Sequence, residues 1–146
     1  MANRFSEVQA KAVKQIGRCG RISLLTAWKD SYILSLDGIA AYVIPYHSFV
    51  LHADRIDTEA EINADTFMAR EEQARQIEIT NRQVIVNGIT FTEFVNNGRV
   101  MYAETKLLKT FGNHCSYKAN PESGSGLIWI YDGNDILIGF IAPANI

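Results

Sequence analysis

The chain has 146 residues, of which 47% are hydrophobic and 21% charged, and its formal net charge is −2. This size and composition predict a single folded domain and exclude disordered, collagen-like and low-complexity chains. No apolar run is long enough to span a bilayer, and neither a signal-peptide pattern nor a disulfide framework is present, so we expect a cytoplasmic protein without membrane contact.

The first predicted element is a helix that begins near Ser6 and ends at Gly17. Ser6 and Gln9 have the spacing of a capping box, in which both side chains satisfy free backbone N–H groups at the helix start. Glycine adopts the left-handed conformation that ends helices at no steric cost. Apolar residues recur at helical spacing and predict one buried stripe: Val8, Ala12, Val13 and Ile16.

β-type sequence follows the first helix. Residues 22–28 and 32–36 predict strands joined by a turn at Lys29-Asp30. Asp37-Gly38 then predicts a hairpin with a primed turn, and residues 39–44 predict its second strand.

The middle of the chain is acidic and less regular. Residues 54–76 predict either a helix near 65–73 or a loop with a short strand at 61–64. Residues 76–80 and 83–86 alternate in polarity and predict a hairpin that turns at Asn81-Arg82. A tight turn at Asn87-Gly88 precedes the remaining predicted elements, which are strands 89–94 and 99–102, a helix 104–111 closed by Gly112, and a final hairpin with strands 127–131 and 136–141.

A 95-residue offset relates the two ends of the chain. Residues 32–38 fall on residues 127–133, and both segments end in Asp-Gly. The helical segment 12–17 falls on 107–112 in the same register. We therefore expect an α+β domain, residues 1–146, made of two helix-plus-antiparallel-hairpin repeats (6–45 and 101–146) around an insertion with hairpins (46–100). A chance match between common elements is the alternative.

The repeat also predicts the core and two basic helix faces. The expected core residues are Val13, Ile16, Leu34, Leu36, Leu108, Phe111, Ile128 and Ile130. Lys11 and Lys14 fall on Lys106 and Lys109 under the same offset. With 100° per residue, Lys11, Lys14 and Arg18 lie within about 60° of one another on the first helix. Either face could instead be ordinary solvated surface.

Two segments resemble the DNA sliding clamps, and in particular the last domain of the bacterial β clamp. Residues 101–111 (Met-Tyr-Ala-Glu-Thr-Lys-Leu-Leu-Lys-Thr-Phe) are similar to a strand followed by a helix of the type Asn-Ala-x-x-Leu-Leu-x-x-Leu. Residues 141–146 (Ile-Ala-Pro-Ala-Asn-Ile) are similar to the final clamp strand, aliphatic-Met-Pro-Met-Arg-Leu. Ala144 and Asn145 stand where the family has Met and Arg.

The resemblance implies a non-enzymatic, replication-accessory protein that contacts duplex DNA without reading its sequence. Clamp helices present basic residues to phosphates, and the matching positions are Lys11, Lys14, Arg18, Lys106 and Lys109. The family's groove for partner peptides carries over to Ile141, Pro143 and Ile146. Because one domain cannot close a ring, the resemblance implies a homo-oligomer or a domain that no longer encircles DNA.

Sequence motifs for catalysis or metal binding are not apparent. His47, His52 and His114 lack the spacing of a metal site, and Cys115 beside His114 is more simply a buried thiol. We therefore expect no enzyme activity, no cofactor and no metal. The alternative function is a protein-interaction or inhibitor module of a mobile element or phage, which would use the acidic segment 54–72.

Overall fold

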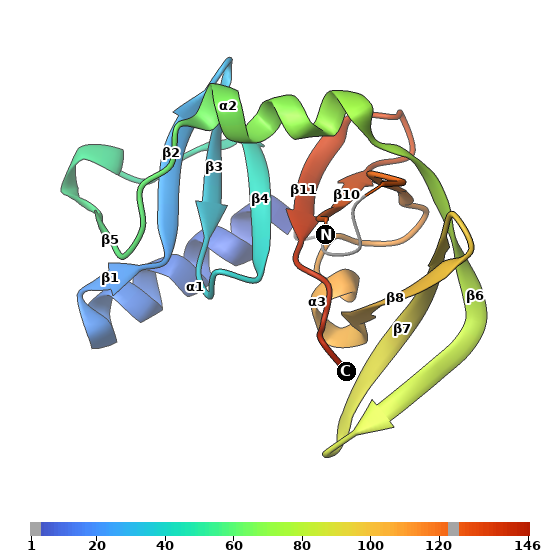
Figure 1. Cartoon of the computed structure of the whole chain (residues 1–146). Helices are drawn as coiled ribbons and strands as arrows, with labels where there is room; N and C mark the ends of the chain where they lie inside the picture. The colour runs from blue at the N-terminus through green and yellow to red at the C-terminus, as the bar shows by residue number, and fades with distance from the viewer. Residues whose placement is uncertain (1–3, 123–125) are drawn as a thin grey trace. The chain divides into compact units, whose positions relative to one another are not determined.

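The computed structural model describes residues 4–122 and 126–146 and has an α+β fold (Figure 1). The chain forms two compact units that divide between Met68 and Ala69. We call the N-terminal part unit 1 and the C-terminal part unit 2.

Unit 1 combines one long helix with a three-stranded antiparallel sheet. Strand β3 (Ser31–Ser35) pairs with β2 (Leu24–Trp28) on one side and with β4 (Ala40–Pro45) on the other. Helix α1 (Arg4–Cys19) lies on one face of this sheet (Figure 1). The shorter elements are β1 (Arg21–Ile22), η1 (Tyr46–Ser48), η2 (Ala53–Arg55), β5 (Asp57–Thr58) and α2 (Ala64–Met68).

Helix α1 is longer than the sequence predicted, and its buried side is different. The helix passes through Gly17 and ends at Cys19, because Gly20 adopts the left-handed conformation (φ +82°) and its N–H bonds to the Ile16 carbonyl. The buried residues are Val8, Gln9 and Ala12, whereas Val13 is 57% exposed. The prediction of Val13 as a core residue is therefore wrong. The buried side of the helix contains the amide side chain of Gln9, and Val13 is exposed.

Unit 2 is built from six antiparallel strands. Their order across the sheet is β11-β10-β9-β6-β7-β8. These strands are β6 (Arg75–Val86), β7 (Ile89–Asn96), β8 (Arg99–Glu104), β9 (Ser116–Ala119), β10 (Ile128–Tyr131) and β11 (Leu137–Ile141). Helix α3 (Thr105–Lys109) connects β8 to β9, and η3 (Ala69–Gln73) precedes β6.

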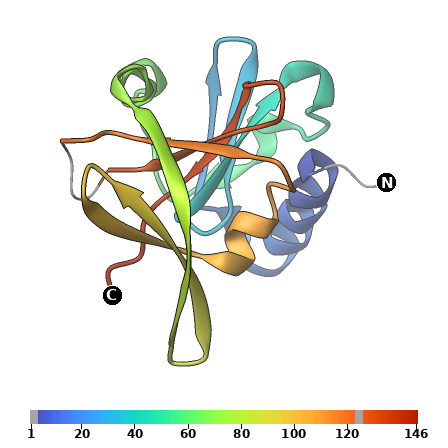
Figure 2. The ribbon, with the colours of Figure 1, turned by 90° about the vertical axis from the view of Figure 1, so that its right-hand side faces the viewer.

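The segment after β11 returns to β8, at the other end of this strand order. The Ala144 N–H donates to the Tyr102 carbonyl at 2.7 Å. The six strands thus curve around a common interior (Figure 2), where Phe94, Phe111 and Ile130 are fully buried. The ring of Phe94 also packs edge-on against the ring of Tyr117, with 5.0 Å between the two ring centroids.

The predicted hairpin across Asn81-Arg82 is wrong, because residues 75–86 form the single strand β6. The register between β6 and β7 shifts between Ile79 and Gln83, which makes residues 80–82 a bulge. Thr80 stabilises this bulge: its hydroxyl accepts the Arg82 N–H at 3.2 Å and donates to the Glu93 carboxylate at 3.0 Å. The polar dipeptide therefore bends the strand without reversing it.

The glycine turns were predicted with mixed success. Asn87-Gly88 and Asn97-Gly98 have positive φ at both residues, as primed two-residue turns require. The hairpin at Asp37-Gly38 is present, but only Gly38 has positive φ. Asp37 Oδ1 instead accepts the N–H groups of Ile39 and Ala40, which gives a longer loop.

The other predicted elements agree with the structure in most cases. The alternative of a helix within residues 65–73 is confirmed by α2 and η3, and Gly112 (φ +95°) follows the turn that extends α3. Five of the eight expected core residues are buried: Leu34, Leu108, Phe111, Ile128 and Ile130. Ile16 and Leu36 are only half-buried.

Leu108 of α3 is buried, whereas Val13 of α1 is exposed, and this difference leads to a stability prediction. Leu108→Ala should lower the free energy of unfolding by about 2–5 kcal/mol, because it opens a cavity in the interior of unit 2. Val13→Ala should change it by less than about 0.5 kcal/mol, because that side chain is exposed. Urea denaturation of both variants measures the difference, and equal losses would contradict the burial pattern.

Candidate functional site

Helix α1 is fixed to unit 1 by two glutamine amides. The buried Gln9 donates through Nε2 to the Ser48 carbonyl at 2.9 Å, and its Oε1 accepts the Val50 N–H at 2.8 Å. The predicted capping role of Gln9 is therefore wrong, since its amide bonds to a segment about 40 residues away in sequence. These bonds set the rotation of the helix about its own axis.

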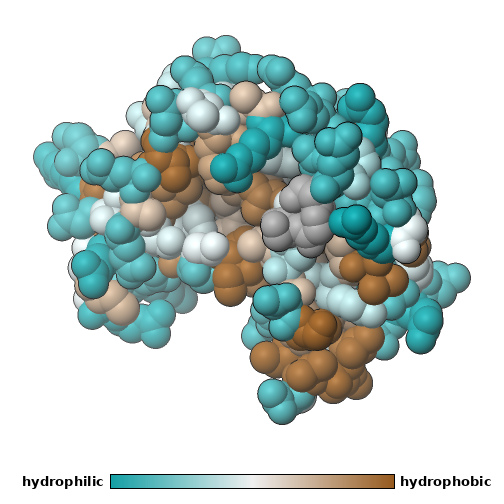
Figure 3. Space-filling view, viewed as in Figure 1, coloured by the Kyte–Doolittle hydropathy of each residue, from teal (hydrophilic) through white to brown (hydrophobic). Residues whose placement is uncertain are grey.

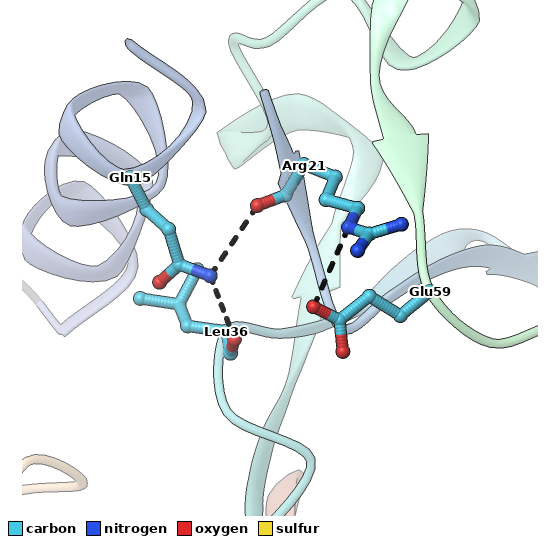
Figure 4. A network of polar contacts seen from close by, with 4 residues as sticks. All are labelled: Gln15, Arg21, Leu36 and Glu59. Carbon is cyan, nitrogen blue, oxygen red and sulfur yellow. Dashed lines mark hydrogen bonds and ion pairs between the residues drawn. The ribbon is translucent and has the colours of Figure 1, made fainter. Parts of the chain in front are cut away.

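Gln15 provides the second attachment, near the C-terminal end of α1 (Figure 4). Its Nε2 donates to the Leu36 carbonyl at 2.9 Å and approaches the Arg21 carbonyl at 3.4 Å. The Arg21 side chain in turn lies 3.7 Å from the Glu59 carboxylate in an exposed ion pair, which contributes little to stability.

With this rotation, the basic residues of α1 point to solvent. Lys11, Lys14 and Arg18 are all exposed. Arg18 lies in the last turn, where a positive charge also interacts favourably with the helix dipole. The helix therefore presents a basic face of three residues, as the sequence predicted.

Helix α3 presents the second pair of predicted basic residues. Its Leu108 is buried, and Thr105 shares a hydrogen bond of 2.8 Å with Thr92 of β7. Lys106 and Lys109 are exposed on the same helix. They line an open pocket of about 550 Å³, together with Gln83 and Thr90 of the β6–β7 hairpin. Helix α1 belongs to unit 1 and α3 belongs to unit 2, so the two basic faces lie on different units.

The predicted partner-binding residues have unequal access to solvent. Ile141 is fully buried in β11, so it forms part of the core of unit 2. Pro143 is half-buried, and the adjacent Ala144 is bonded to β8. Only Ile146 is largely exposed. The tail is thus held to β8 by the Ala144 hydrogen bond and has an exposed apolar side chain, Ile146, at its end.

The acidic segment 54–72 is mostly surface. Its exposed carboxylates are those of Asp54, Asp57, Glu59, Glu61, Asp65 and Glu72. Glu71 is different, because it is half-buried and accepts the hydroxyl hydrogen of Tyr131. Burial and this hydrogen bond raise the pKa of Tyr131 well above its ordinary value.

The sequence analysis missed a polar cluster that joins three strands of unit 2. Glu93 of β7 is buried (5% exposed), and its carboxylate accepts the hydroxyls of Tyr102 on β8 at 2.9 Å and Thr80 on β6 at 3.0 Å. The Tyr102 hydrogen bond lowers the pKa of Glu93 more than burial raises it. The Glu93 carboxylate in turn raises the pKa of Tyr102. Strand register, which a sequence does not display, brings the three residues together.

Among residues 4–122 and 126–146, no three His, Cys, Asp or Glu side chains are grouped so that they could hold a metal ion. In the same part of the chain, no helix combines the length and apolar character needed to cross a bilayer.

Comparison of the chain with family models, curated proteins and solved structures finds no match.

Gln9 gives a direct test of how α1 is held. Gln9→Ala should lower the free energy of unfolding by about 1–3 kcal/mol, because it leaves the Val50 N–H and the Ser48 carbonyl without their partner. Gln73→Ala, at an exposed position, is the matched control and should have little effect. Urea denaturation measures both, and an unchanged Gln9→Ala midpoint would show that the amide does not anchor the helix.

The Glu93 cluster predicts a pH dependence. The pKa of Glu93 is lower in the folded chain than its ordinary value of 4.5, so ionised Glu93 stabilises the fold above pH 4.5. That stability is lost as the pH falls through the folded-state pKa. Tyr102→Phe should raise the pKa of Glu93, and Tyr46→Phe, at an exposed tyrosine, should not. NMR titration of the side-chain carboxyl groups measures the pKa of Glu93 directly. An unchanged pKa of Glu93 in Tyr102→Phe would contradict this assignment.

Proposed function

We propose that the chain is a non-enzymatic, sliding-clamp-like protein that contacts duplex DNA phosphates through the basic faces of α1 and α3. The observation that supports this most is the order of elements. In unit 1, α1 precedes the antiparallel meander β2-β3-β4, and in unit 2, α3 precedes the antiparallel meander β9-β10-β11. The proposal treats these as two copies of one repeat.

The charged residues support the proposal at the level of single positions. The 95-residue offset pairs Lys11 with Lys106 and Lys14 with Lys109, and all four are exposed. Contacts of lysine with phosphate need no base recognition, so they suit a protein that does not select sequence.

Two observations limit how far the repeat extends in detail. Helix α1 has 16 residues and α3 has five. The offset also pairs the exposed Val13 with the buried Leu108. The proposed equivalence therefore applies to the order of elements and to the lysines, and it does not apply to the packing of the two helices.

Oligomerisation is part of this proposal. A chain of 146 residues with a net charge of −2 offers each DNA molecule only a few cations. Several copies would have to assemble to surround a duplex or to bind it tightly.

A second candidate is a protein-interaction module that uses the acidic segment 54–72. Six exposed carboxylates in this segment favour a basic partner. It would become the leading candidate if the chain does not bind DNA.

DNA binding is testable with fluorescence anisotropy of a labelled duplex at low salt. We expect weak, sequence-independent binding whose affinity falls steeply as salt rises, because each phosphate contact releases a counterion. The double variant Lys14→Glu/Lys109→Glu should weaken binding by about tenfold or more. The double variant Lys29→Glu/Arg99→Glu changes the net charge equally at exposed positions outside the helices and should have a much smaller effect. No binding at high micromolar protein, or equal losses in both variants, would overturn the proposal.

A further inference from the structure

Strand β6 has a hydrogen-bonding edge that is only partly used. On one side it pairs with β7 over most of its length. On the other side it pairs with β9 only at its first three residues, Arg75, Gln76 and Ile77. Within the part of the chain that the structure describes, residues 78–86 have no strand on that side. Beyond the bulge at residues 80–82, the regular edge of residues 83–86 is a template for another strand.

The turn at Asn87-Gly88 determines which backbone groups face this edge. In a two-residue hairpin, the flanking residues Val86 and Ile89 form a hydrogen-bonded pair, and hydrogen-bonded and non-hydrogen-bonded pairs then alternate. The backbone N–H and C=O groups of Val84 and Val86 therefore bond to β7. The N–H and C=O groups of Gln83 and Ile85 point to the open edge.

The same part of the hairpin carries exposed apolar side chains. Ile85 is 71% exposed, and Ile89, beyond the turn, is 44% exposed. Figure 3 shows hydrophobic residues gathered over the end of the hairpin, which projects past β8 and β9 in Figure 2. Polar edges and charged side chains normally protect an open strand, yet the edge from Gln83 to Val86 has no charge.

We propose that the β6 edge pairs antiparallel with β6 of a second copy of this chain, about a two-fold axis at Val84. In this register Gln83 lies opposite Ile85 of the second copy, and Ile85 lies opposite its Gln83. Both are positions whose backbone groups face outward, so each pair forms two hydrogen bonds. A second strand satisfies such alternating donors and acceptors along an edge.

The register also fits the side chains. Val84 lies opposite Val84 of the second copy, and two β-branched residues in such a pair pack well across strands. Arg82 falls opposite Val86, so no two like charges face each other. A register centred on Arg82 would place the two guanidinium groups opposite each other, which disfavours it. The edge is therefore self-complementary in one particular register.

This two-fold contact does not require DNA, and it differs from a ring. The same patch is used by both copies, so the contact closes at two and cannot continue to a third. It thus gives a dimer whether or not the basic helix faces bind phosphate.

Sedimentation velocity over a range of concentrations tests the dimer. The wild-type chain should shift from monomer to dimer as its concentration rises to high micromolar. Ile85→Lys should keep it monomeric, since a lysine there blocks edge pairing. Ile136→Lys, at an isoleucine of similar exposure in the β10–β11 loop, should dimerise like the wild type. A wild-type monomer at every concentration, or a dimer that survives Ile85→Lys, would overturn the proposal.

Cysteine cross-linking tests the register without a charge change. In a background with Cys19→Ser and Cys115→Ser, Val84→Cys should form a reducible dimer on mild oxidation. Its Cα atom would lie about 4.5 Å from that of its own copy, within disulfide range. Ile85→Cys is more exposed but lies opposite Gln83 of the second copy, so it should cross-link several-fold less. Faster cross-linking of Ile85→Cys than of Val84→Cys would overturn the register.

Discussion

Unit 2 depends on how the two hydrogen-bonding edges of β6 are satisfied. Along one edge β6 pairs with β7, and along the other it pairs with β9 for only three residues. Because β9 follows α3 and continues into β10 and β11, this short ladder joins the meander β6-β7-β8 to the meander β9-β10-β11. The bond from Ala144 to Tyr102 then holds the chain after β11 against β8. The interior that contains Phe94 and Phe111 forms between these connections.

Buried polar groups have the same organising role as the apolar core. Gln9 occupies a position where an amphipathic helix would normally carry an apolar side chain, and its amide bonds to Ser48 at the end of η1 and to Val50 just after it. Glu93 joins three strands through the hydroxyls of Thr80 and Tyr102. Each of these groups is paired, so its burial specifies one rotation of a helix or one register of strands.

The surface combines features that suit two different kinds of partner. The basic faces of α1 and α3 belong to different units of a chain that is acidic as a whole, and they have few cations, so phosphate contacts would be few per copy. The apolar end of the β6–β7 hairpin is a contact surface of another kind, because it offers backbone groups as well as side chains. A two-fold dimer through the hairpin would contain two copies of each basic face, and this doubling matters for any weak, charge-driven contact.

The sequence by itself determined most of the element types and the turns at Asn87-Gly88 and Asn97-Gly98. Alternating apolar residues, the Asn-Gly dipeptides and the glycine after α3 specify strands and turns through interactions between near neighbours, and the exposed lysines follow from helical periodicity. Tertiary structure alone decided that Asn81-Arg82 is a bulge, that Val13 is exposed and Gln9 buried, and that Ile141 belongs to the core. The first two outcomes depend on partners distant in the chain: Glu93 for the bulge and residues 48–50 for Gln9. Sequence periodicity indicates which residues share one face of a helix or strand. It does not indicate which other part of the chain packs against that face.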